Sequence, residues 1–209
     1  MRKIILLSLI LTSSLLLKSQ INAVTETGDE VILYNDGTWK YLNNISDEEK
    51  QIPVNQTKYF KDEKSTFLVK SKKLNVGIWI NPKSWSFKKG TDEDAGEFVF
   101  EKKGEDLYAM LISEKVEIPI PNLIDIAFEN AKSASPDVRV VKKEYRNVNG
   151  VQVLMMQMAG TIQGIRFTYY GYYYSNSNGT IQLLTYTSES LFNDYLDEIE
   201  LFLNGFVEL

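Results

Sequence analysis

The sequence VRVVKKEYRNVNGVQVLMMQMAGTIQGIRFTYYGYYYSNSNGTIQLLTYT, residues 138–187, decides the fold of this chain. It contains apolar, aromatic-rich runs separated by turn residues. Asn149-Gly150 is the strongest short-range hairpin signal among them, because both residues tolerate the positive φ of a type I′ turn. Gln163-Gly164 and Ser175 to Gly179 supply the next two turns. We therefore predict four consecutive antiparallel strands, at Val138 to Val148, Val151 to Thr161, Ile165 to Tyr174 and Thr180 to Thr187.

The second of these runs is apolar on both of its faces. Side chains alternate between the two faces of a strand. Val153 and Met155 fall on one face, and Leu154 and Met156 fall on the other. Such a strand is expected to lie in the middle of a sheet that is covered on both sides.

Two amphipathic helices are expected to supply that cover. The first follows Pro121, has Asn122 as its N-cap and ends before Pro136. In the second, apolar residues recur at a spacing of three and four between Leu191 and Leu203.

Gly205 is expected to end the second helix in a Schellman arrangement, with Phe206 against Leu201.

Two further elements precede the first helix. Residues 74–80 alternate in hydrophobicity with the period of a half-buried strand, which Pro82 stops. The runs Glu97 to Glu101 and Leu107 to Val116 flank a five-residue loop that contains Gly104, which predicts a hairpin.

The first 23 residues have the pattern of a secretory signal. Arg2 and Lys3 precede the apolar run Ile4 to Leu17, and Ala23 offers a cleavage point. The run is shorter than the ~20 residues needed to span a bilayer. The chain has no cysteine for a lipid anchor or a disulfide. We expect a protein without a stable membrane anchor after cleavage, periplasmic or secreted.

Residues 24–42 are predicted to form a separate β-hairpin element. Its strand-like runs, residues 31–34 and 38–41, flank a three-residue loop that ends in Gly37. Residues 43–64 contain few apolar side chains and are expected to be a polar linker. The main domain is expected to span residues 65–209.

Charge limits the partners. The 209-residue chain has 23 basic and 28 acidic side chains. Loss of Arg2, Lys3 and Lys18 with the signal leaves 20 against 28, a net charge of −8. Phosphate backbones repel such a protein, so we expect no nucleic-acid partner.

The order of elements resembles a known family. That order is a strand followed by Asn81-Pro82 and Trp85, a hairpin, a helix, the Asn149-Gly150 turn, three strands, and a helix that ends near Phe202 to Phe206. The chain thereby resembles the Mog1/PsbP-like α/β/α sandwich, a group that includes exported bacterial DcrB-like proteins. The N-terminal run 33–41 also resembles a "LydDGTWxY" motif of exported bacterial proteins. The resemblance implies an α+β fold, an antiparallel sheet covered by helices, and a role in binding or assembly.

The composition excludes several chemistries. Without histidine or cysteine, the chain lacks Ser-His-Asp and Cys-His catalysis and the usual zinc ligands. Asp92, Glu93 and Asp94 could serve a carboxylate-dependent hydrolase or a weak calcium site, but a solvated acidic loop is the simpler interpretation. We predict no catalytic residues, metal or cofactor.

The tyrosines of the third run are the candidate binding residues. Tyr170, Tyr172 and Tyr174 share one face with Arg166, where rings could stack on a ligand or peptide. Trp79 and Trp85 could line a pocket. The alternative, which we favour, is that the tyrosine rings belong to the core and that the two tryptophans seal the sheet edge.

Two functional hypotheses follow. The first is an exported, non-enzymatic binding or assembly module of the cell envelope, whose partner is an unidentified protein or small ligand. The second is a hydrolase that acts on envelope polysaccharide.

Overall fold

The computed structural model describes residues 20–25, 30–34, 37, 39–41, 52–91 and 96–209. The chain divides into two compact units between residues 51 and 52.

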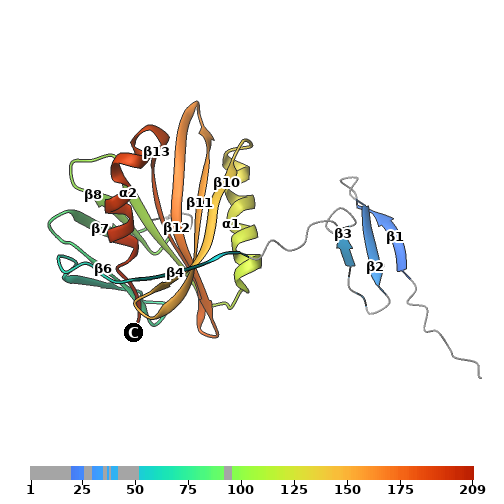
Figure 1. The fold of residues 1–209 in the computed structure, drawn as a ribbon, viewed down its shortest axis with the longest axis horizontal. Helices are drawn as coiled ribbons and strands as arrows, with labels where there is room; N and C mark the ends of the chain where they lie inside the picture. The colour runs from blue at the N-terminus through green and yellow to red at the C-terminus, as the bar shows by residue number, and fades with distance from the viewer. Residues whose placement is uncertain (1–19, 26–29, 35–36, 38, 42–51, 92–95) are drawn as a thin grey trace, which may run out of the picture. The chain divides into compact units, whose positions relative to one another are not determined.

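An eight-stranded sheet is the centre of the second unit (Figure 1). Its strands follow the order β4-β10-β11-β12-β13-β9-β8-β7, and every neighbouring pair is antiparallel except β4 and β10. The strands are β4 (Val54–Tyr59), β7 (Trp85–Lys89), β8 (Phe98–Lys102), β9 (Tyr108–Glu114), β10 (Arg139–Val148), β11 (Val151–Ile162), β12 (Ile165–Asn176) and β13 (Gly179–Ser188).

Strands β10 to β13 confirm the four consecutive antiparallel strands predicted from residues 138–187. Asn149 and Gly150 both have positive φ, 50° and 87°, as the tight turn between β10 and β11 requires. Gln163 and Gly164 repeat this conformation between β11 and β12. The hairpin of β8 and β9 is also confirmed.

A second, three-stranded sheet has the order β14-β6-β5. Its strands are β5 (Phe67–Lys70), β6 (Val76–Ile80) and β14 (Phe206–Glu208). Strand β6 was predicted, whereas β5, β7 and β14 were not. Strands β5 and β7 are short, and each pairs with the next strand along the chain. Strand β14 has three residues and follows a helix directly, so its pairing with the distant β6 defines it rather than a local pattern.

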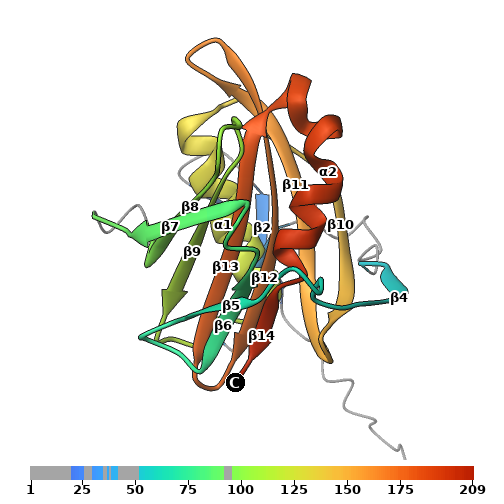
Figure 2. The ribbon, with the colours of Figure 1, turned by 90° about the vertical axis from the view of Figure 1, so that its left-hand side faces the viewer.

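Two helices cover opposite faces of the eight-stranded sheet (Figure 2). Helix α1 (Ile120–Ala134) packs on the face that carries Leu154 and Met156. Helix α2 (Glu189–Leu203) packs with the small sheet on the other face, with Val153 and Met155. The structure thus confirms the α+β sandwich, with β11 central and apolar on both sides.

The predicted start of the first helix and the predicted C-terminal cap of the second helix need correction. Helix α1 begins two residues before Asn122, with Pro119 at the N-cap position. Pro121 is compatible with the first turn because the N–H that proline lacks would have no partner there.

Gly205 does not adopt a left-handed conformation, so the Schellman arrangement was wrong. Helix α2 ends at Leu203, and Asn204 keeps right-handed helical angles. A Cβ atom on Gly205 would lie 2.0 Å from the carbonyl oxygen of Trp79. Glycine is therefore required here by the close approach of β6.

The predicted linker, residues 43–64, is wrong in its second half. Strand β4 pairs with β10 and belongs to the main unit, which begins at Ile52 rather than Ser65. The side chains of β4 are mostly exposed, because the strand lies at a sheet edge. A polar edge strand has the composition of a linker, which explains the error.

The first unit contains a three-stranded antiparallel sheet, β1 (Gln20–Val24), β2 (Glu30–Tyr34) and β3 (Trp39–Tyr41). The predicted pairing of residues 31–34 with 38–41 is confirmed, because residues 31–33 of β2 pair with residues 39–41 of β3. Gly37 has a φ of 84°. Strand β1 contains four residues that were assigned to the signal. Processing after Ala23 would leave β2 and β3 as a hairpin.

Within the ranges given above, no helix is long and apolar enough to cross a bilayer.

Candidate functional site

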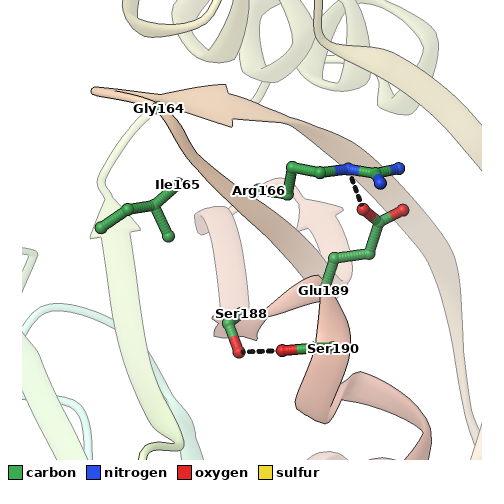
Figure 3. Close-up of a pocket in the computed structure, with 6 residues that line it drawn as sticks. All are labelled: Gly164, Ile165, Arg166, Ser188, Glu189 and Ser190. Carbon is green, nitrogen blue, oxygen red and sulfur yellow. Dashed lines mark hydrogen bonds and ion pairs between the residues drawn. The ribbon is translucent and has the colours of Figure 1, made fainter.

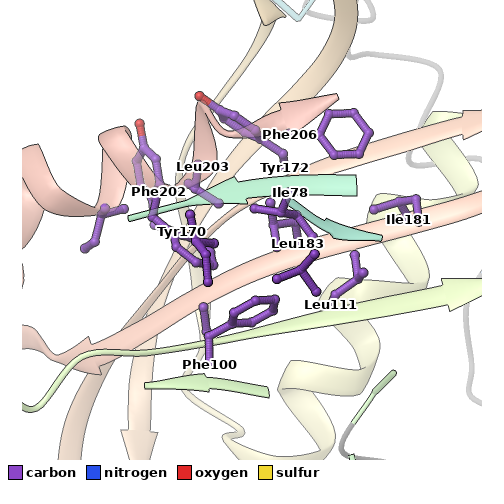
Figure 4. Packing of buried hydrophobic residues seen from close by; sticks show 14 of the residues in the cluster. Ile78, Phe100, Leu111, Tyr170, Tyr172, Ile181, Leu183, Phe202, Leu203 and Phe206 are labelled. Atoms are coloured by element: carbon purple, nitrogen blue, oxygen red, sulfur yellow. The ribbon is translucent and has the colours of Figure 1, made fainter. Parts of the chain in front are cut away.

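Tyr170 and Tyr172 belong to the core beneath α2 (Figure 4). Their side chains are 4% and 1% exposed. The ring of Tyr170 lies 5.8 Å from that of Phe192 of α2. These two tyrosines therefore offer no exposed stacking surface, and the packing alternative holds for them.

The hydroxyls of Tyr170 and Tyr172 converge on a buried charge. Arg146 of β10 is 4% exposed. Its Nη2 donates to Tyr170 Oη at 2.8 Å, and its Nη1 donates to Tyr172 Oη at 3.3 Å. The guanidinium also lies 4.6 Å from the ring centre of Tyr59. The sheet thus holds an arginine in an aromatic environment, where cation–π attraction is strengthened by desolvation.

Two carboxylates neutralise Arg146. Its Nε donates to Glu144 Oε1 at 2.7 Å, and its Nη1 donates to Glu200 Oε2 at 2.6 Å. Burial alone would raise the pKa of Glu144, but hydrogen bonds from Asn55, Arg146 and Lys142 outweigh it and lower the pKa to about 2. Burial likewise raises the pKa of Tyr170 and Tyr172. Because Glu200 belongs to α2, the cluster ties the helix to the sheet.

Sequence reasoning missed this cluster. One signal was available: Glu144 and Arg146 share the strand face of buried Val148 in β10. Two charged residues at inward-facing positions of a strand indicate a buried ion pair.

Of the other aromatic candidates, only Trp85 is fully buried among the described residues. Trp85 is 2% exposed, and its Nε1 donates to Glu198 Oε1 at 2.8 Å. Tyr174 is partly buried, with its ring 5.5 Å from that of Phe206. Trp79 is partly exposed, with the Lys61 ammonium 5.3 Å from its ring centre. The structure does not bring the two tryptophans together as a pocket lining.

Arg166 lies apart from the three tyrosines with which it was grouped. It lines a shallow cavity of about 510 Å³ at the β11–β12 turn, where its Nε pairs with Glu189 (Figure 3). The Arg166 side chain is 70% exposed. An exposed pair of this kind contributes little energy.

The acidic candidates Asp92, Glu93 and Asp94 lie outside the described residues. Among the residues that are described, no cluster of acidic side chains has a composition that could hold a metal ion.

A different set of tyrosines forms a partly exposed row on the α1 side of the sheet. Tyr169 of β12, Tyr186 of β13 and Tyr108 of β9 are direct cross-strand neighbours. The rings of Tyr108 and Tyr186 stack with their centres 5.5 Å apart, and that of Tyr169 meets Tyr186 edge-on at 5.8 Å. All three are only partly buried.

An aliphatic row lies beside the tyrosines. Leu184 of β13 pairs with Met110 of β9, and Met110 with Val99 of β8. Leu184 is 9% exposed, and the other two are partly exposed. We call these two rows, Tyr108, Tyr169, Tyr186, Leu184, Met110 and Val99, the tyrosine face.

The tyrosine face is partly exposed because α1 covers only part of its side of the sheet. A helix is about 10–12 Å across and strands are about 4.8 Å apart, so one helix covers two or three strands. The buried residues of α1 share a cluster with Met156 of β11, Tyr173 of β12 and Leu184 of β13, and Tyr169 and Met110 pack against this cluster. Tyr186, Tyr108 and Val99 lie outside it.

The fold is an α+β sandwich with a partly exposed aromatic row on one face of its sheet. No protein-family model and no curated protein sequence matches the chain. The fold assignment rests on solved structures.

PsbP of the cyanobacterium Synechocystis (CyanoP) is similar over 68% of this chain and 92% of its own, with 14% identity and a TM-score of 0.52. LpqN of Mycobacterium tuberculosis, a protein involved in cell envelope biogenesis, covers 68% of this chain and 88% of its own, with 9% identity and a TM-score of 0.48. PA94 of Pseudomonas aeruginosa, a protein of unknown function, covers 64% and 90%, with 10% identity and a TM-score of 0.41.

Proposed function

We propose that this protein is an exported, non-enzymatic binding or assembly module of the bacterial cell envelope, of the DcrB-like type, and that it binds a protein partner through the tyrosine face. The observation that carries the proposal is the apolar composition of a sheet face that its own helix leaves partly uncovered. Antiparallel sheets commonly have one face toward water, but that face is then polar.

The energetics favour a binding role for this face. Tyrosine combines a large apolar ring with a polar hydroxyl, which makes it frequent at the centre of protein interfaces. Tyr108, Tyr169 and Tyr186 contact one another, so their rings are already ordered before a partner arrives. Preordered side chains lose less entropy on binding.

Export is supported by the pattern of the first 23 residues, with the basic start at Arg2 and Lys3 before an apolar run. Cell fractionation and the mass of the exported chain test this part. Recovery of the chain only in the cytoplasm would contradict it.

Site-specific photo-crosslinking in the bacterial host tests the binding face. A photoreactive phenylalanine analogue replaces Tyr186 in the full chain, and the same analogue replaces Val141 of β10, which is 49% exposed, as a control. We expect adducts of defined mass from position 186 and not from position 141. Equal yields from both positions, or none from position 186, would refute the proposal.

A further inference from the structure

The Tyr108 end of the tyrosine face carries negative charge. Glu101 of β8 is the direct cross-strand neighbour of Tyr108, and it is exposed. Asp106 precedes β9 by two residues and is also exposed. The charge of Asp106, followed by burial, a hydrogen bond with the Asp106 side chain and the charge of Glu101, raises the pKa of the Tyr108 hydroxyl. Both carboxylates therefore act on this ring.

The loop that carries Asp106 is held against the sheet. Thr187 Oγ1 of β13 donates to the main-chain oxygen of Asp106 at 2.6 Å. The N–H of Lys102 donates to the oxygen of Leu107 at 2.9 Å, which closes the β8–β9 hairpin. Asp106 is thus anchored beside β13, the strand of Tyr186.

Neither carboxylate has a cationic partner within the part of the chain that the structure describes. The neighbouring Lys102 pairs instead with Glu105 and Glu198. Two carboxylates beside a stacked pair of tyrosine rings provide the chemistry that binds a guanidinium or ammonium group, by charge and by cation–π attraction.

We infer that the tyrosine face takes a partner segment with a basic side chain next to aliphatic ones, the basic group lying on Tyr108 between Glu101 and Asp106. The aliphatic side chains lie over Met110 and Val99, the partly exposed members of the aliphatic row. This inference rests on the proposed function, whose face it uses. The net charge of −5 for the chain adds long-range attraction for a basic partner.

Arginine fits this position better than lysine. Its planar guanidinium stacks on an aromatic ring while its N–H groups reach carboxylates at the side. One ring is enough for such stacking, and the contact with Tyr186, with ring centres 5.5 Å apart, keeps the Tyr108 ring in place.

Peptide titration followed by NMR tests the inference on the full mature chain. The probes are acetyl-Leu-Arg-Leu-amide, its citrulline analogue and its glutamate analogue, because citrulline keeps the shape of arginine without its charge. We expect the arginine peptide to shift the amide signals of β8, β9 and β13, with an affinity about tenfold above that of the citrulline peptide, a difference of about 1.4 kcal/mol. The glutamate peptide is expected to bind most weakly.

Charge variants localise the effect. In the Glu101→Gln, Asp106→Asn double variant, the preference for arginine over citrulline is expected to disappear, while the citrulline peptide binds as before. The matched control is Asp194→Asn, Asp197→Asn on α2, where both residues are exposed. It removes the same charge from the opposite side of the sheet and is expected to keep the preference.

The outcomes separate the two proposals. Equal shifts by the arginine and citrulline peptides at the tyrosine face overturn the basic-partner inference and leave the binding face intact. Shifts that avoid β8, β9 and β13 altogether count against both. An arginine preference lost equally in both double variants reflects net charge alone and also overturns the inference.

Discussion

Replacing Arg146 with methionine is expected to lower the free energy of unfolding by about 3–5 kcal/mol at pH 7, the usual cost of removing one partner from a buried ion pair. Methionine fills much of the same volume but leaves Glu144, whose side chain is 9% exposed, without its closest cation. A typical domain has a net stability of about 5–15 kcal/mol. The variant is therefore expected to be marginally stable.

The pKa of Glu144 supports this magnitude. Its shift from 4.5 to about 2 corresponds to about 3 kcal/mol, of which Asn55 and Lys142 supply part. The substitution also removes the hydrogen bonds that Arg146 donates to Glu200 and Tyr170, which lowers the free energy of unfolding further.

The pH dependence follows from the sign of that shift. Because the folded-state pKa of Glu144 is depressed, its contribution is present above about pH 4.5 and is lost as the pH falls toward 2. The difference between the wild type and Arg146→Met is therefore expected to shrink between pH 7 and pH 3.

Urea unfolding at pH 7 and pH 3, followed by tryptophan fluorescence, measures these changes. Adding Glu144→Gln to Arg146→Met removes the unpaired charge and is expected to restore at least about 1 kcal/mol. The control is Lys142→Met, whose 52% exposed side chain pairs with the same carboxylate and is expected to cost less than about 1 kcal/mol. A loss below about 1 kcal/mol for Arg146→Met, or a loss that does not depend on pH, would refute the reasoning.

Four further substitutions test the packing and one exposed ion pair. Tyr172→Phe is expected to cost about 1–2 kcal/mol in urea unfolding, because the Tyr172 hydroxyl donates to Asn204 Oδ1 at 2.8 Å. Tyr173→Phe is expected to cost nothing or to stabilise, because the Tyr173 hydroxyl is buried without a hydrogen-bond partner among the described residues. Equal losses for the two variants would contradict this expectation. Gly205→Ala is expected to cost about 1–3 kcal/mol through overlap with the Trp79 carbonyl, and an unchanged Tm would show that the backbone can shift. Glu189→Gln is expected to cost less than about 1 kcal/mol by thermal unfolding, because its arginine partners Arg139 and Arg166 are 60% and 70% exposed. A larger loss would indicate an energetic role for these pairs.

Much of the fold could be predicted from local patterns. Alternation and the Asn149-Gly150 and Gln163-Gly164 turns located β10 to β13, because strand period and turn chemistry are properties of neighbouring residues. Strands β4 and β14 escaped prediction. One is polar and the other has three residues, so each is defined by the strand beside it.

Tyr170 and Tyr172, which the sequence offered as binding residues, lie on a face that the structure buries. The alternation of residues 165–174 placed Tyr170 and Tyr172 on one face and Tyr169 on the other. Which face is open depends on the helix that covers it. Helix α2 and the small sheet bury the first face, whereas α1 leaves Tyr169 and its neighbours Tyr186 and Tyr108 partly exposed.

The sequence by itself determined the strand order along residues 138–187, the two-sided burial of β11 and the absence of histidine and cysteine chemistry. These follow from residue type and from spacing within a few positions. Only the tertiary structure decided that Arg146 is buried with Glu144 and Glu200, and that Tyr108 joins Tyr186 beside Glu101. These contacts join residues far apart in the chain, and their register is set by the packing of the whole sheet.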